Sequence, residues 1–135
     1  MDMLRFTIVS RNNSYELSYD DSSNCLSLAY FGLWDKMSQL EYFIADVKSM
    51  ISHSNPGFDV IYDFTQYKGC ENQFVSLQVE VQNLLLESGL DKVAVLINEN
   101  QLLKASVEFI FQMSGINPTF FCNIGMLHKW LDSFK

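Results

Sequence analysis

The side chains most able to do chemistry gather in one stretch, DVIYDFTQYKGCEN, residues 59–72. It offers a carboxylate, a hydroxyl, a phenol and a thiol, at Asp63, Thr65, Tyr67 and Cys70. A β-type run ends at Asp63, and a long apolar-periodic segment begins just after Cys70. In an α/β domain, the loop between a strand and the next helix commonly carries ligand-binding or catalytic groups. This loop is therefore the first candidate site.

Cys70 would be a reactive thiol if a helix N-terminus lowered its pKa. Catalysis by cysteine also needs a base, usually a histidine held nearby. The two histidines of the chain are His53 and His128, and neither forms a recognisable pair with Cys70. The sequence therefore favours a passive cysteine here.

The two oxygen-bearing candidates have ordinary structural explanations as well. An acid at a strand end, such as Asp63, could be a general base, but more commonly it bonds loop amides or a helix start. A loop hydroxyl such as that of Thr65 most often bonds the backbone. We find no glycine-rich phosphate loop and no nucleophile-elbow motif. The sequence thus predicts a protein that is not an enzyme and has no cofactor.

A metal centre is not predicted either. Zinc sites need three or four converging histidine, cysteine or carboxylate ligands. Cys25, Cys70 and Cys122 do not show metal-type spacing, and a framework of disulfide pairs would leave one of them over. Three such cysteines indicate a reducing compartment, so we expect a cytoplasmic protein.

The charge of the chain limits its partners. The formal net charge is −7, and the nine basic residues are scattered along the sequence. Nucleic acids and anionic membranes are recognised through clustered Lys and Arg, so both are disfavoured as partners. There is no apolar run of about 18 residues that could span a membrane. The first residues, MDMLRFTIVSRNN, do not have the pattern of a signal peptide.

The periodicity of apolar residues predicts one α/β domain over residues 1–135. Strands are expected at 4–10, 15–20 and 25–31, and their short polar connections make them an antiparallel meander. Strands and helices then alternate, with helices expected at 36–52, 72–88, 101–114 and from 124, and strands at 58–63, 92–97 and 118–123. This βββαβαβαβα order requires a mixed sheet, in which parallel strands joined by right-handed crossover helices follow the meander.

The order of these elements and several local features resemble the STAS-like superfamily, in particular its SpoIIAA-like, anti-anti-sigma-factor-like branch. The resemblance covers roughly residues 14–132 and rests on YELSYDDSSNCLSLAYFGLWDKMSQLEYF, FDVIYDFTQY, ESGLDKVAVLINE and FFCNIGMLHKWL. Within these pieces, the residues that match the branch are Gly32, Asp63, Gly89, Lys92, Ala94, Leu96, Trp130 and Leu131.

The resemblance implies a regulatory or protein-interaction module without catalysis, whose protein partner is unknown. The best-known members are switched by phosphorylation of a serine in an Asp-Ser-Ser-Gly-like motif. Gly69, Cys70, Glu71 and Asn72 stand at the matching place here, so that switch does not carry over. The architecture also resembles that of the CRAL-TRIO lipid carriers.

The aromatic content of 14% gives the second hypothesis, a carrier or sensor of a small apolar ligand such as a lipid or fatty acid. Trp34 could anchor the core or border a pocket mouth, and the sequence leaves both readings open. The aromatic residues that could line a pocket are Tyr30, Trp34, Phe43, Phe74, Phe109 and Phe111. The candidate surface for a ligand or partner comprises Trp34, Asp63, Thr65, Tyr67, Cys70 and Phe74.

Extra apolar positions on the second and third predicted helices need an explanation. Val75, Val79 and Leu86 form a stripe beside the main apolar face of helix 72–88. Such a stripe must meet a neighbouring helix, a subunit partner or an apolar ligand. We expect a homodimer with these helices packed across a two-fold axis.

Overall fold

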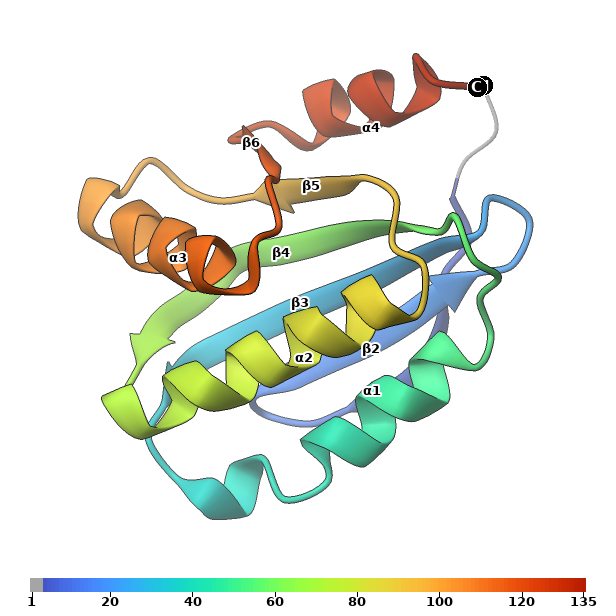
Figure 1. Ribbon diagram of the computed structural model, residues 1–135. Coiled ribbons are helices and arrows are strands. Elements are labelled where there is room, and N and C mark those ends of the chain that lie inside the picture. Colours follow the sequence, from blue (N-terminus) through green and yellow to red (C-terminus); the bar gives the residue numbers. More distant parts are fainter. Residues whose placement is uncertain (1–3) are drawn as a thin grey trace.

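In the part of the chain that the structure describes, six strands lie side by side in chain order in one mixed sheet (Figure 1). The computed structural model describes residues 4–135. Residues 1–3, which belong to the stretch without a signal-peptide pattern, lie outside it. β1 (Thr7–Arg11), β2 (Tyr15–Asp20) and β3 (Cys25–Trp34) are antiparallel. β4 (Asp59–Cys70), β5 (Val93–Leu96) and β6 (Thr119–Phe121) continue the sheet parallel to β3. The predicted mixed α/β sheet is confirmed.

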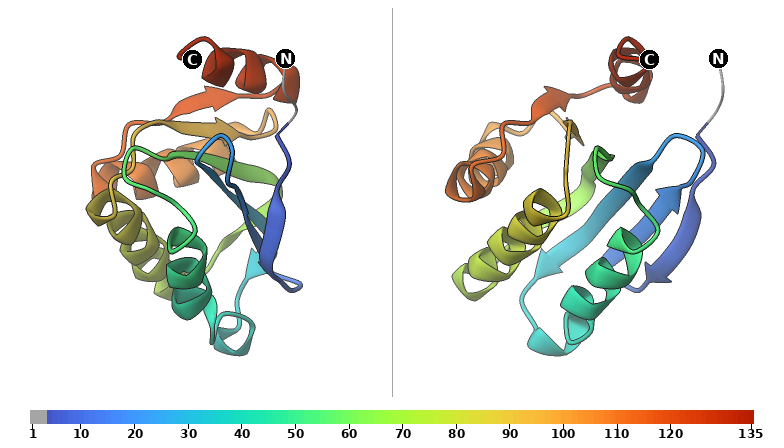
Figure 2. Two further views of the ribbon diagram at one scale, coloured as in Figure 1. Left: turned by 90° about the vertical axis from the view of Figure 1, so that its right-hand side faces the viewer. Right: turned by 45° about the vertical axis from the view of Figure 1, so that its right-hand side comes forward.

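Three helices cover one face of the sheet and the fourth lies on the other (Figures 1 and 2). α1 (Phe43–Ile51), α2 (Val75–Glu87) and α3 (Gln101–Ser114) are the crossover helices. Because the strands are added in one direction, right-handed crossovers must place all three helices on the same face. α4 (Ile124–Asp132) follows the last strand and folds over the opposite face.

The face under the crossover helices contains the main core, which is rich in aromatic rings. Tyr30 stands at its centre, with its ring 4.4 Å from that of Trp34 and 5.8 Å from that of Phe43. All three side chains are buried. A smaller second core joins α4 to the opposite face through Leu127 and Leu131.

The strand predicted at 58–63 is longer than expected, so the prediction of a loop after Asp63 is wrong. β4 continues through Cys70, so Thr65, Tyr67 and Cys70 belong to a strand rather than to a loop before a helix. The reason is that β3 also continues past its predicted end to Trp34 and pairs with β4 as far as Cys70. The other predicted strands differ by up to three residues at their ends.

Two helices begin later than predicted. The segment before α1 holds a 3-10 turn over Met37–Gln39, and α2 follows a 3-10 turn over Asn72–Phe74. No side chain caps the start of α1 or α2, so no local signal in the sequence marks where either helix begins. In contrast, α3 matches its predicted bounds, since Asn100 caps its start and Gly115 ends it with a φ of 85°. The last helix ends at Asp132.

Candidate functional site

The edge of the sheet at which β3, β4 and β5 end lies on the left in Figure 1. Three adjoining hollows lie along this edge. The first is about 510 Å³ and is lined by residues 11–13, 31–32, 66 and 68. The second, of about 450 Å³, is lined by residues 33, 67–70, 100, 102–103 and 106. The third, of about 490 Å³, is lined by residues 97–101, 104 and 120–122. Neighbouring hollows share Lys68 or Asn100, so we treat them as one feature, the edge groove.

Two glycines shape the strands beneath the edge groove. Gly32 has a φ of 63° and Gly69 a φ of 109°, values that favour glycine. The pairing of β3 with β4 shifts register here, between Ala29 and Phe31 and again between Gly32 and Leu33. Such irregularities bend a strand and are common beside functional sites. Here they lie in the stretch of the β3–β4 pair that borders the groove.

Tyr67 and Cys70 contribute to the second hollow. The Tyr67 hydroxyl accepts a hydrogen bond of 2.9 Å from Nε2 of Gln78 on α2. Cys70 is half-buried, and burial raises the pKa of its thiol, although bonds with Tyr67 and Gln78 oppose this. A nucleophilic cysteine needs a lowered pKa, so this environment disfavours a reactive thiol at Cys70.

Asp63 and Thr65 bond to one another beside the groove. Oδ1 of Asp63 accepts the backbone N–H of Thr65 at 2.9 Å and the Thr65 hydroxyl at 2.6 Å. The Thr65 hydroxyl was expected to bond the backbone, and it bonds this carboxylate instead. The Thr65 carbonyl accepts a bond of 2.9 Å from Nδ2 of Asn98, a residue of the third hollow. This arrangement ties the strand to the next loop.

The fold does not assemble the acid, the thiol and an imidazole. The side chains of Tyr62 and Phe64 enter the main core, so Asp63 between them points to the opposite face, whereas Cys70 packs against the main core. His53 stacks on Tyr19 of β2, with ring centroids 4.1 Å apart, and His128 belongs to α4.

Trp34 and Phe74, also candidates for a ligand or partner surface, are buried. Nε1 of Trp34 donates a hydrogen bond of 3.0 Å to the backbone carbonyl of Ser14, so Trp34 anchors the core. Among the proposed pocket-lining residues, Tyr30, Phe43 and Phe111 are likewise buried, and Phe109 is 58% exposed. The apolar-ligand hypothesis stays an untested prediction.

The predicted dimer stripe lies on the side of α2 that faces α3. Gln82 of α2 accepts a 2.6 Å bond from the hydroxyl of Ser114 on α3, and Val75, Val79 and Leu86 lie three, four or seven positions from Gln82. Val75 and Val79 are half-buried and Leu86 is exposed. α3 adds Leu102, Phe109 and Met113, which are exposed by 87%, 58% and 53%. We call these six residues the α2–α3 stripe.

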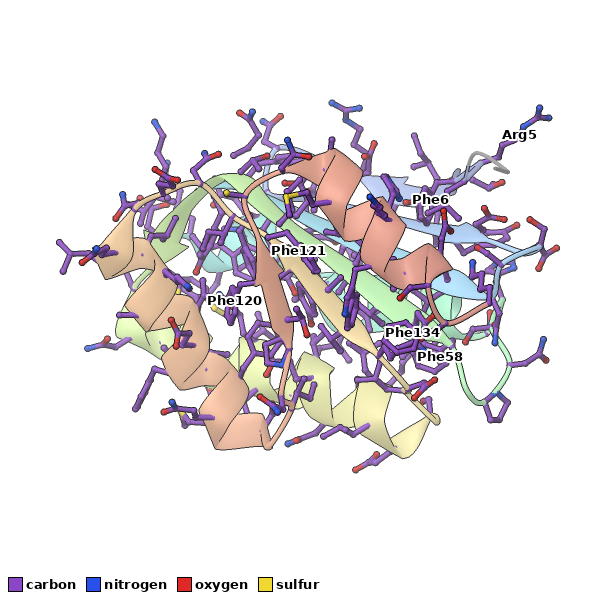
Figure 3. All side chains as sticks on the ribbon, turned by 90° about the horizontal axis from the view of Figure 1, so that it is seen from above. Arg5, Phe6, Phe58, Phe120, Phe121 and Phe134 are labelled. Carbon is purple, nitrogen blue, oxygen red and sulfur yellow. The ribbon has the colours of Figure 1, made fainter. Side chains whose placement is uncertain are left out.

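Aromatic rings hold two cations at the two ends of the edge groove. Arg11 lies with Cζ 5.9 Å from the ring centroid of Phe31 in the first hollow. Lys104 lies with Nζ 5.1 Å from the ring centroid of Phe120 in the third. Figure 3 shows Phe120 on the α3 side of β6, whereas Phe121 points toward α4. Neither pair could be predicted from local sequence, because only the fold brings such distant residues to one edge.

Residues 4–135 contain no group of three histidine, cysteine or acidic side chains arranged to hold a metal ion. Within the same range, every helix is too short or too polar to cross a bilayer.

No family model matches the sequence, and no curated protein matches it. Its fold, however, is found in solved structures. An uncharacterised DUF3478-family protein with a SpoIIAA-like fold, from Shewanella loihica PV-4, has a TM-score of 0.60 and 14% identity, over 95% of this chain and 93% of that one. Apo-SiaC of Pseudomonas aeruginosa has a TM-score of 0.54 and 11% identity, over 87% of this chain and 98% of that one. A second SiaC structure has a TM-score of 0.50 and 11% identity, over 89% and 98%. This chain therefore has a SpoIIAA-like fold.

Proposed function

We propose that the chain is a non-catalytic regulatory module that acts in the cytoplasm by binding another protein, and that residues 1–135 work as one domain. The resemblance of the sequence to STAS-like proteins supports this role, since such domains act through protein contacts. Cys25, Cys70 and Cys122 are all free thiols, which agrees with a reducing compartment.

The observation that carries the proposal is the edge groove. Its walls come from the β1–β2 hairpin, the ends of β3 and β4, the start of α3 and the end of β6. Loops and strand ends presented by a rigid sheet are a common way to build a recognition surface. The lining brings amides, cations and apolar side chains together, and it contains no nucleophile paired with a base.

Affinity capture from the native cell, followed by mass spectrometry, tests this function. Ser106 is exposed in the second hollow, so Ser106→Trp should block the groove without changing its charge. Ser49 is an exposed residue of α1, so Ser49→Trp adds the same bulk there and serves as the control. We expect a specific protein to be captured by the wild type and by Ser49→Trp, and to be lost with Ser106→Trp. A purified chain that captures no protein and instead carries a stoichiometric small molecule would contradict the proposal.

We also propose that the chain forms a homodimer through the α2–α3 stripe. Three of the six residues of this stripe are more than half exposed, although they are apolar. Closed two-fold dimers are the commonest way for a soluble protein to cover such a surface. Glu80 and Glu87 of α2 are exposed and would have to remain in water at the rim of the interface.

A further inference from the structure

The edge groove has the opposite charge to the rest of the protein. The chain has 16 acidic and nine basic residues. The groove, in contrast, is lined by three cations, Arg11, Lys68 and Lys104, and by one acid, Glu99. A cationic groove on an acidic protein attracts anionic groups to that place and repels them elsewhere.

These cations are available to a ligand. Lys68 and Lys104 form no salt bridge within residues 4–135. Arg11 contacts Glu16 at 3.2 Å, but its side chain is 65% exposed and keeps other donors free. Phe31 and Phe120 hold Arg11 and Lys104 in place at the two ends, and Lys68 lies where the first and second hollows meet. The positive charge is therefore spread along the groove.

The spacing of the cations fits an extended ligand better than a small ion. The two end cations lie over Phe31 of β3 and Phe120 of β6, which are three strand spacings of about 4.8 Å apart, so the groove between them is roughly 15 Å long. An extended peptide advances about 3.3 Å per residue, so about five residues would fill it. Exposed amides of Asn13, Gln66 and Gln101 can donate to and accept from a peptide backbone.

We propose that the edge groove binds an acidic, extended segment of the partner protein, with its carboxylates facing Arg11, Lys68 and Lys104. This inference rests on the proposed protein-binding function and names the chemistry of the bound segment. A nucleic acid is a poorer occupant, because its many phosphates would meet three cations on a chain with a net charge of −7.

The test uses the full chain and two fluorescent eight-residue peptides, one alternating Glu and Ser and the other alternating Gln and Ser. Fluorescence anisotropy should show binding of the Glu peptide at least about tenfold tighter than that of the Gln peptide, and weaker in high salt. Lys68→Glu and Lys104→Glu should each weaken binding about fivefold or more. Lys48 is an exposed residue of α1, away from the groove. Lys48→Glu makes the same charge change there and should alter peptide binding less than about twofold.

Three results with the peptides would overturn the inference: no binding of the Glu peptide, equal binding of both peptides, or equal losses with Lys48→Glu. Equally tight binding of an eight-nucleotide single-stranded DNA would overturn it too, since the groove would then accept any polyanion. Circular dichroism shows whether each variant is folded. If a partner protein is lost with Ser106→Trp while the Glu peptide does not bind, the proposed function stands and this inference fails.

Discussion

The side-chain amide of Gln78 on α2 donates a hydrogen bond to the hydroxyl of Tyr67 on β4, and only 2% and 4% of these two residues are exposed. The bond joins the wall of the edge groove to the helix that covers the main core. Because water does not reach either group, neither can replace its partner with a solvent molecule.

Tyr67→Phe should therefore destabilise the protein by about 1–3 kcal/mol, since it leaves a buried amide without its acceptor. Urea unfolding followed by circular dichroism measures this loss. The double variant Tyr67→Phe/Gln78→Leu removes both polar groups and should cost less than the sum of the two single changes. Equal stability of Tyr67→Phe and the wild type would show that the bond does not contribute.

The buried phenols and the buried thiol predict a loss of stability at alkaline pH. Burial raises the pKa of Tyr30, Tyr62 and Tyr67, and it raises the pKa of Cys25 to about 12. In the unfolded chain these groups ionise at their ordinary values, about 10 for Tyr and about 8.5 for Cys. The unfolded state therefore holds fewer protons than the folded state above about pH 9, and stability falls as pH rises.

Below about pH 8 the contribution of these groups to stability is complete, so the urea midpoint should not depend on them there. Between about pH 9 and 12 we expect the urea midpoint to fall. Each group that has ionised only in the unfolded state should cost about 1.4 kcal/mol per pH unit. Cys25→Ala should reduce the decline near pH 9 and 10. Phenolate absorbance gives a second measurement, because these tyrosines should titrate at lower pH in urea than in the folded protein. Identical titrations in both states would contradict the prediction.

The order of elements could be predicted because it depends on periodicity and on local stop signals. The bounds of α3 follow from Asn100, whose side chain accepts the N–H of Leu103, and from Gly115. Both signals are local, so the sequence displays them.

The end of β4 could not be predicted, because it depends on a distant strand. Thr65, Tyr67 and Gly69 belong to a strand because β3 pairs with β4 along this stretch. Local sequence alone predicts a loop here, because the stretch is polar and contains a glycine. The edge groove was missed for the same reason. Its cations Arg11, Lys68 and Lys104 belong to separate parts of the chain, and no local motif links them.

Gly69 provides a direct test of the backbone beneath the groove. Its φ of 109° is strained for any other residue, although an added Cβ would meet no atom within 4 Å. Gly69→Ala should therefore cost about 1–2 kcal/mol through the backbone alone. Gln66→Ala changes an exposed residue of the same groove and should stay within about 0.5 kcal/mol of the wild type. If both variants unfold at the same urea concentration, the conformation at Gly69 is not under strain.

Self-association through the α2–α3 stripe gives the last prediction. Size-exclusion chromatography with light scattering should give twice the chain mass of 15.6 kDa at concentrations of about 10–100 μM. Phe109→Glu and Val79→Glu should each yield a monomer, because each places a charge in an interface that would bury at least about 1,000 Å². Met126→Glu makes a similar change at an exposed position of α4, on the other face of the sheet, and should leave the dimer intact.

The three variants also separate the ways in which the prediction can fail. A wild-type monomer at these concentrations would exclude the dimer. A dimer that survives Phe109→Glu and Val79→Glu but dissociates with Met126→Glu would place the interface on α4 instead. Dissociation by Phe109→Glu alone would confine the interface to α3, because Val79 of α2 is half-buried, whereas Phe109 of α3 is 58% exposed.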